Sequence, residues 1–229
     1  MSIKSELEKL ADPEKAKLLS GFFKTGKGQY GEGDIFLGVM VPNTRKVVRQ
    51  HEDATFEELE ELLNSKIHEH RLAALLVLVE NFPTNKDVIY EFYMKNTKKI
   101  NNWDLVDCSA PYIVGGYLLD RDRSVLYKLA KSDNIWERRI AIIATLNFIK
   151  NKKFDDTVKI AEILLEDKHD LIHKAVGWML REMGKRGGLA EEEMFLQKNS
   201  KKMPRTMLRY AIERFDKEKR GEYMKRSNQ

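Results

Sequence analysis

The sequence predicts an all-α fold, a solenoid of about six stacked helix pairs. Three observations support this prediction. Apolar residues recur with the helical period along most of the chain, and the alternation typical of strands is nearly absent. Residue types that start helices stand where the periodic stretches begin. Similar segments also return at an interval near 35 residues, which is typical of arrays of helix pairs.

Each periodic stretch predicts one helix. The stretches are Phe56–Leu63, Leu72–Phe82, Val88–Met94, Trp136–Ile149, Val158–Leu165 and Ile172–Met183. Helix starts are predicted at Asp12, at Thr84 and at Ser132–Asn134, because short polar side chains cap helix N-termini. The pattern gives no clean boundary, so we expect a single domain over residues 1–229.

A self-comparison places four cations in register, one in each of four similar segments. They are Arg71, Arg139, Lys174 and Arg209, at separations of 68, 35 and 35 residues. The first separation equals two repeats of 34 residues. The intermediate repeat would have its cation at position 105, which is Leu105. Signatures of tetratricopeptide and ankyrin repeats are not evident, so HEAT-like helix pairs fit better. We expect the second helix of each pair to line a concave groove.

Composition narrows the class of protein. The chain has 229 residues, of which 42% are hydrophobic and 34% are charged, and it is long enough to bury a core. No apolar run approaches the ~20 residues that cross a bilayer. The charged N-terminus lacks the apolar segment of a secretion signal. We therefore expect a cytoplasmic protein that does not bind membranes.

The sequence indicates neither a metal nor a cofactor. The single cysteine, Cys108, excludes an intramolecular disulfide and a cysteine-rich zinc site, and we expect it to be a packing residue. The histidine pair His68 and His70 does not share a helix face. Gly26–Gly31 matches G-x-G-x-x-G, but a helical stretch precedes it and an extended or irregular segment follows, whereas a dinucleotide site needs a strand before it and a helix after it.

The C-terminal segment 197–229 is basic. It holds 11 Lys and Arg residues against four acidic residues, a net charge of +7, whereas the whole chain carries +5. The remainder is therefore slightly acidic. A basic segment is compatible with phosphate binding, and a solvated tail is the alternative interpretation.

Trp103 and Asp107 form the first candidate site. They are four residues apart, so they share a face of any helix that contains both. Pro111 limits that helix, and we expect a second helix to start near Ala110. An aspartate on an apolar stripe needs a partner or a function. A capping or salt-bridged aspartate beside a core tryptophan is the structural alternative.

Arg139 is the second candidate, because it lies on a stripe of apolar residues. A guanidinium in such a place pairs with a carboxylate or binds a phosphate in a bidentate manner. An ion pair with Asp107, in the neighbouring repeat, is the structural alternative.

The third candidate is a basic stripe interrupted by an indole, formed by Lys174, Trp178, Arg181 and Lys185 at helical spacing. Such a stripe fits a groove that follows a nucleic-acid backbone and offers one aromatic platform. A core tryptophan flanked by cations whose stems lie along apolar surface is the alternative.

Three segments together resemble the bacterial DNA alkylation repair family of HEAT-like-repeat alkylpurine DNA glycosylases, the AlkD type. They are Trp103–Asp107, Ser132–Arg139 and Ile172–Glu182, and their order and separations agree with the family. The resemblance covers most of the chain. It is weakest over residues 25–42, where this sequence has a longer glycine-rich insert, and after Lys198.

The resemblance implies a partner, a reaction and roles for several residues. The partner is double-stranded DNA, and the reaction is excision of positively charged bases such as N3-methyladenine and N7-methylguanine. The resemblance maps an aromatic pair onto Trp103 and Trp178, the acid onto Asp107 and a phosphate-facing arginine onto Arg139. We expect a monomer that binds DNA through Lys174, Arg181, Arg205 and Arg209. A non-catalytic nucleic-acid-binding protein and a protein–protein scaffold are the alternatives.

Overall fold

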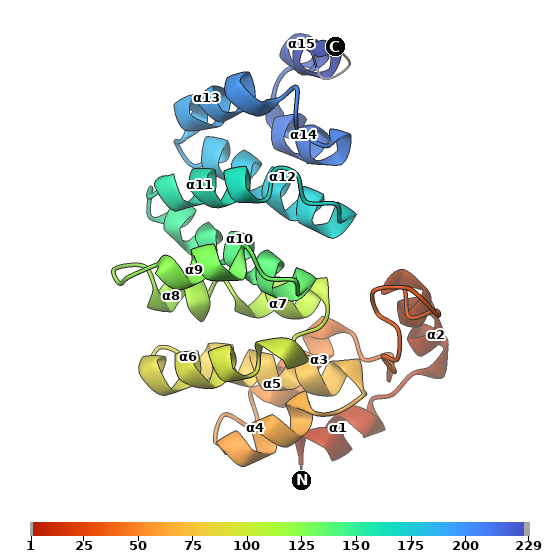
Figure 1. Ribbon diagram of the computed structural model, residues 1–229. Coiled ribbons are helices and arrows are strands. Elements are labelled where there is room, and N and C mark those ends of the chain that lie inside the picture. The colour runs from red at the N-terminus through yellow and green to blue at the C-terminus, as the bar shows by residue number, and fades with distance from the viewer. Residues whose placement is uncertain (1, 227–229) are drawn as a thin grey trace. The chain divides into compact units, whose positions relative to one another are not determined.

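The computed structural model describes residues 2–226 and divides the chain into two compact units, one ending at Ser109 and one beginning at Ala110 (Figure 1). Every named element among the described residues is a helix, and the β-bridge found there, between Ile35 and Ile67, belongs to no named strand. The predicted all-α class is therefore confirmed. The last three residues of the basic segment 197–229 lie outside the described residues.

The first unit contains seven α-helices and a 3-10 turn within its described residues. They are α1 (Ile3–Lys9), α2 (Pro13–Phe22), α3 (Val41–Val48), α4 (Phe56–Leu63), α5 (His68–Asn81), α6 (Lys86–Lys95), η1 (Thr97–Lys99) and α7 (Trp103–Ser109). Residues 68–78 of α5 are all buried, and α1, α3, α4 and α7 pack around this helix. The core of the unit therefore lies along α5.

The segment between α2 and α3 contains no helix and no named strand, and one carboxylate holds residues 37–39 of it. Glu69, in the first turn of α5, accepts hydrogen bonds from the backbone N–H groups of Leu37, Gly38 and Val39, the shortest at 2.8 Å. Gly38 has a φ of +86°, and a Cβ there would lie 2.1 Å from the carbonyl oxygen of Asp12. Both its conformation and its close approach therefore require glycine.

The second unit contains eight α-helices and a 3-10 turn among its described residues. They are α8 (Val114–Tyr117), α9 (Ser124–Leu129), α10 (Ile135–Lys150), α11 (Asp155–Ile163), α12 (Asp170–Lys185), α13 (Leu189–Asn199), α14 (Arg205–Ala211), η2 (Ile212–Arg214) and α15 (Lys217–Arg226). Figure 1 shows α12 between α10 and α14, and these helices pack directly on one another. They carry the predicted cations Arg139, Lys174 and Arg209, so the repeat interval corresponds to successive stacked helices.

A glycine allows α12 and α14 to approach closely. A Cβ at Gly177 would lie 2.4 Å from the carbonyl oxygen of Met207 and 2.5 Å from Cβ of Tyr210. Any larger residue would push the two helices apart. Gly177 therefore sets the spacing between the cations of α12 and those of α14.

The predicted helices agree with the observed ones to within a few residues, and the predicted starts at Asp12 and Asn134 are confirmed caps. Asp12 Oδ1 accepts from the N–H of Glu14, and Asn134 Oδ1 accepts from the N–H of Trp136. Among residues 2–226, no helix is both long enough and apolar enough to span a membrane.

The prediction of a helix starting near Ala110 was wrong. Residues 110–113 form a turn, and α8 begins only at Val114. The carbonyl oxygen of Pro111 accepts a hydrogen bond from Asn147 Nδ2 of α10, at 3.2 Å, instead of entering a helical ladder. A contact between this turn and α10 thus accompanies a helix that starts about one turn later than predicted.

Candidate functional site

Trp103 and Asp107 both lie on α7, one helical turn apart, so the predicted shared face is confirmed. Both side chains are half-buried, whereas the intervening residues Asp104, Leu105 and Val106 are buried. The N–H of Trp103 donates to Asn102 Oδ1 at 2.8 Å and so satisfies one of the free donors at the start of the helix. The tryptophan and the acid therefore stand on the partly exposed face of a helix whose other faces are fixed in the core.

Aromatic side chains from α2 and the following loop surround Trp103. The ring of Phe23 stacks on the indole with centroids 5.2 Å apart, and Phe22 meets the indole edge-on at 5.9 Å. Phe23 is buried, whereas Phe22 is 62% exposed. One face of Trp103 is thus covered by Phe23, and an exposed aromatic ring lies beside it.

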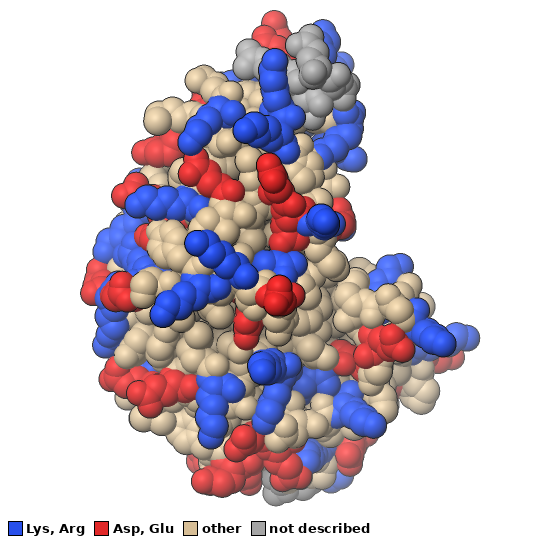
Figure 2. Space-filling model, in the orientation of Figure 1, with Lys and Arg blue, Asp and Glu red and all other residues tan. Residues whose placement is uncertain are grey.

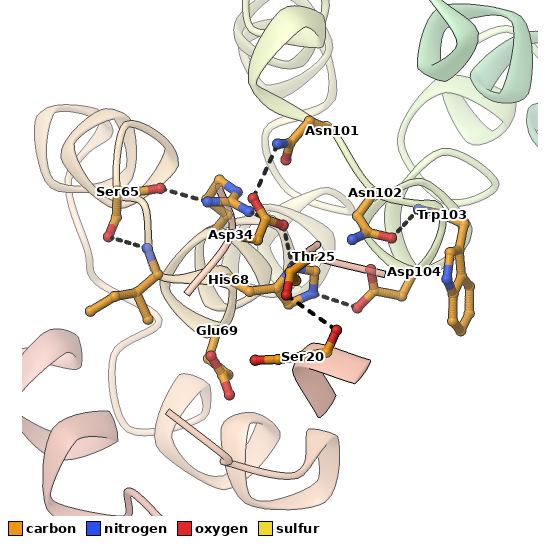
Figure 3. A network of polar contacts seen from close by, with 12 residues as sticks. Ser20, Thr25, Asp34, Ser65, His68, Glu69, Asn101, Asn102, Trp103 and Asp104 are labelled. Carbon is orange, nitrogen blue, oxygen red and sulfur yellow. Dashed lines mark hydrogen bonds and ion pairs between the residues drawn. The ribbon is translucent and has the colours of Figure 1, made fainter. Parts of the chain in front are cut away.

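A buried polar network lies against α7 (Figure 3). At its centre is His68, whose Nε2 lies 2.7 Å from Asp104 Oδ2 and whose Nδ1 lies 3.3 Å from Asp34 Oδ2. Arg71 Nη2 lies 2.7 Å from the same oxygen of Asp34. These four side chains come from α5, α7 and the loop after α2, so the network ties all three segments together.

The network shifts the pKa of two of its members. Burial acts to lower the pKa of His68, but the charge and hydrogen bond of Asp104, together with Asp34, outweigh it and raise the pKa to about 9. For Asp34, burial acts to raise the pKa, and the hydrogen bond with His68 and the charge of Arg71 lower it by more. Both shifts favour the charged forms at neutral pH.

Three of the predicted DNA-binding residues meet around one cavity of the second unit. Lys174, Arg181 and Arg209 line a space of about 580 Å³ together with Asp170, Thr206, Tyr210 and Glu213. The last predicted DNA-binding residue, Arg205, is exposed at the start of α14 and lies outside this lining. The cavity is therefore formed by side chains of α12, α14 and η2.

Acidic side chains counter the basic residues of this cavity. Lys174 Nζ lies 2.6 Å from Asp170 Oδ2, one turn earlier on α12, and Arg181 is ion-paired with Glu213. Figure 2 likewise shows Lys and Arg interspersed with Asp and Glu over the helices of the second unit on the face drawn. The basic stripe expected from the sequence is thus partly neutralised.

Trp178 and Arg139 also belong to the second unit. Trp178 is half-buried on α12, between Lys174 and Arg181 in the sequence. Arg139 is only 5% exposed, and its Nη1 donates to the carbonyl oxygen of Leu171 at 2.6 Å. Arg139 therefore connects α10 to the start of α12.

Sequence reasoning missed several neighbours of the candidate residues. Phe22 and Phe23 could have been noticed as an aromatic pair at the end of a predicted helix. Asp170 could have been found from its spacing to Lys174, because residues four apart on a helix form ion pairs. No local signal connects Glu213 with Arg181, because their helices meet only in the folded unit.

The structure agrees with the expected packing role of Cys108. Its side chain is half-buried, and burial raises the pKa of the thiol to about 11. The thiol is therefore protonated at neutral pH and is a poor nucleophile. Within residues 2–226, no group of three or more His, Cys, Asp or Glu side chains is arranged to hold a metal ion.

A family model described as DNA alkylation repair enzyme matches residues 3–215. A solved structure described as a predicted DNA alkylation repair enzyme from Enterococcus faecalis matches with a TM-score of 0.72 at 18% identity, covering 90% of this chain and 97% of that chain. At that identity the likeness shows the fold, which is that of helical repeats. No curated protein matches the chain.

The family match confirms the resemblance drawn from the segments Trp103–Asp107, Ser132–Arg139 and Ile172–Glu182. It spans nearly the whole sequence and supports a role in DNA repair, with DNA as the partner. The chain therefore belongs to the DNA alkylation repair enzyme family.

Proposed function

We propose that this protein is a DNA glycosylase that hydrolyses the N-glycosidic bond of positively charged N3- and N7-alkylated purines in duplex DNA. The observation that carries the proposal is the pair of Trp103 and Asp107, an indole and a carboxylate one turn apart on the partly exposed face of α7. The family supports repair of alkylated DNA in general. The choice of reaction follows the resemblance to alkylpurine DNA glycosylases, and the chemistry of this pair suits that reaction.

A cationic alkylpurine is already a good leaving group, so the enzyme needs little general-acid help. What needs stabilisation is the positive charge that develops on the deoxyribose as the glycosidic bond breaks. In the proposal, the carboxylate of Asp107 lies near C1′, stabilises this charge electrostatically and orients the attacking water. The reaction is a hydrolysis and, as proposed, requires neither a metal nor a cofactor.

The tryptophans have a matching role. An indole face stabilises a nearby cation by about 0.5–2 kcal/mol, and the contribution grows as the site is desolvated. In the proposal, Trp103 and Trp178 bracket the sugar of the lesion, and Arg139 binds an adjacent phosphate.

The cavity lined by Lys174, Arg181 and Arg209 supports binding of the DNA backbone. Three cations around one space suit phosphate groups, which accept bidentate hydrogen bonds from guanidinium groups. Arg205, exposed at the start of α14, extends this basic surface. In the proposal, phosphates replace Asp170 and Glu213 as partners of Lys174 and Arg181, and the protein binds the duplex as a monomer.

The first test is release of N7-methylguanine from methylated duplex DNA, with the protein in excess over the DNA. We expect the wild-type protein to release the base. We expect Asp107→Asn to keep its DNA affinity and to lose about 10²–10³-fold in rate, because the transition-state charge then lacks its counter-ion. The matched control is Asp53→Asn, which removes an exposed carboxylate from the loop before α4, and we expect it to leave the rate unchanged.

The possible failures lead to different conclusions. Unchanged base release by Asp107→Asn would rule out the proposed mechanism. Binding without release by the wild-type protein would favour the non-catalytic DNA-binding alternative. An absence of DNA affinity would favour a protein scaffold.

A further inference from the structure

His68 is a buried histidine with a carboxylate at each ring nitrogen. Its side chain is 2% exposed, its Nε2 faces Asp104 and its Nδ1 faces Asp34. An ionised carboxylate only accepts hydrogen bonds, and neutral imidazole has only one N–H. Both contacts are satisfied together only by the imidazolium, so the geometry indicates a charged His68.

The charges around His68 balance. The groups that face it are Asp34 from the loop after α2, Asp104 from α7 and Arg71 from its own helix α5. With His68 charged, two cations meet two anions in a buried site. Among the described residues, Asp104 Oδ1 has no hydrogen-bond donor, so Asp104 depends on His68 as its partner.

Two routes lead from His68 to Trp103. The first is through the backbone of α7, because Asp104 directly follows Trp103 in the first turn of that helix. The second is through aromatic rings: Phe23 lies 5.0 Å from the His68 ring and 5.2 Å from the indole, centroid to centroid. Phe36 stacks on the His68 ring at 4.6 Å. The imidazolium thus lies against two phenyl rings, an arrangement favourable for a cation.

We propose that the His68 imidazolium, held by Asp34 and Asp104, is a positioning group that sets the orientation of Trp103 through α7 and through Phe23. The inference rests on the proposed function, in which Trp103 contacts the lesion. His68 itself is buried and does not touch DNA. It acts by fixing where the indole stands.

A positioning role predicts a loss of rate with little loss of DNA affinity. We expect His68→Gln to lower the single-turnover rate of base release by about 10–100-fold, because small misplacements of groups at the reacting centre cost this much. The dissociation constant for undamaged duplex DNA should stay within about twofold, since the basic residues of the second unit are intact. His68→Arg, a planar cation with donors on several edges, should restore part of the rate.

His70 provides a matched control on the same helix. It is also 2% exposed, but its ring contacts Ser65, whose Oγ lies 3.0 Å from Nδ1. His70→Asn places an amide near that nitrogen and keeps a polar contact possible. We expect this variant to retain the wild-type rate. If His68→Gln is folded and releases the base at the wild-type rate, the proposal is overturned.

A second measurement needs neither activity nor a folded His68 variant. The wild-type protein labelled with 5-fluorotryptophan gives ¹⁹F NMR resonances for its three tryptophans, and the one missing from Trp103→Phe belongs to Trp103. We expect that resonance to shift with a midpoint near pH 9, as His68 loses its proton. Those of Trp136 and Trp178 should show no such midpoint.

This titration separates the inference from the proposed function. A Trp103 resonance that does not respond between about pH 7 and pH 10 would overturn the coupling, whatever the activity of the protein. A clear midpoint together with no base release by the wild-type protein would instead contradict the proposed function and leave the coupling between His68 and Trp103 supported.

Discussion

Different kinds of contact stabilise each of the two units internally. In the first unit, buried charges bind an irregular segment: Glu69 holds the loop before α3, and His68 joins that loop to α7. In the second unit, α10, α12 and α14 pack through apolar side chains and a close approach at Gly177, while the ion pairs of Lys174 and Arg181 line a cavity.

The difference has a physical reason. A helix satisfies its own backbone, so stacked helices need only a complementary apolar surface. A buried loop cannot satisfy its N–H groups internally, and it needs acceptors from elsewhere. The first unit supplies them as a carboxylate on α5. The stability of the first unit should therefore be sensitive to the loss of single buried charges. The stability of the second unit should be sensitive to changes in side-chain volume where its helices pack.

The largest expected effect is at Glu69. Glu69→Ala leaves three backbone N–H groups of residues 37–39 without their acceptor, which costs about 3–5 kcal/mol of the free energy of unfolding. Urea denaturation followed by circular dichroism measures this loss. Glu80→Ala, which removes an exposed glutamate from the same helix, is the control and should change stability by less than about 0.5 kcal/mol. Equal losses of stability in the two variants would contradict the role of Glu69 in holding residues 37–39.

The second prediction compares one buried titratable group from each unit across pH. The folded protein keeps the proton of His68 up to about pH 9, whereas the unfolded chain loses it near the ordinary value of 6.5. The stabilising contribution of His68 is therefore complete below about pH 6.5 and is lost as the pH rises through 9. Its size is on the order of 3 kcal/mol.

For Glu192 of the second unit, the folded state favours the uncharged form of the side chain, whereas for His68 it favours the charged form. Burial, followed by the charge of Glu193, raises the pKa of Glu192 from 4.5 to about 8, so the folded protein keeps this carboxyl neutral at lower pH. Stability then falls as the pH rises from about 4.5 to 8, because charging the carboxyl in the folded state is unfavourable. As the pH rises, His68 loses a charge that stabilises the folded state, and Glu192 gains a charge that destabilises it.

The two contributions are distinguished by substitution. We expect His68→Gln to be less stable than the wild type near pH 6, with a difference that shrinks above pH 9. We expect Glu192→Gln to be more stable than the wild type above pH 8, with a difference that shrinks toward pH 5. Denaturation midpoints measured over this range test both. If the stability of a variant and that of the wild type change with pH in parallel, the pKa shift assigned to the substituted residue is contradicted.

A volume change should disturb the second unit. Gly177→Ala forces a methyl group against the Met207 carbonyl oxygen, and we expect a loss of about 1–3 kcal/mol. The control is Gly21→Ala in α2, where a Cβ has no atom within 4 Å. That variant should be neutral or more stable by up to about 1 kcal/mol, because alanine favours helix. A neutral Gly177→Ala would show that α12 and α14 can separate at little cost.

The smallest expected effect concerns the charges around the cavity. Glu213→Gln frees Arg181 from its ion pair, and we expect duplex DNA to bind about 2–5-fold more tightly at low salt, the range that partly exposed ion pairs contribute. Asp120→Asn, which breaks a different ion pair of the same unit, is the control. Fluorescence anisotropy at several salt concentrations measures both. Affinity that does not change with salt would argue against phosphate binding at this surface.

Much of the fold could be predicted from periodicity. The stretches Trp136–Ile149 and Ile172–Met183 agree with α10 and α12 to within two residues at each end, because apolar periodicity is a local property. The cation register placed Arg139, Lys174 and Arg209 on stacked helices for the same reason. Spacing alone also placed Trp103 and Asp107 on one face of α7.

The surroundings of the candidate site could not be predicted in this way. His68 lies 34 residues from Asp34 and 36 from Asp104, and no period connects them. The helix α8 starts later than predicted, and the carbonyl oxygen of Pro111 before it accepts a hydrogen bond from Asn147 of α10. The ion pair between Arg181 and Glu213 forms only because α12 packs against α14 and η2.

The sequence alone determined the helical class, the repeat interval and the shared face of Trp103 and Asp107. Each follows from spacings of a few residues along a helix. The tertiary structure decided which charges are paired, which rings cover Trp103 and how an irregular loop is held. Those contacts join distant segments, so they depend on the packing of helices, which a local pattern does not encode.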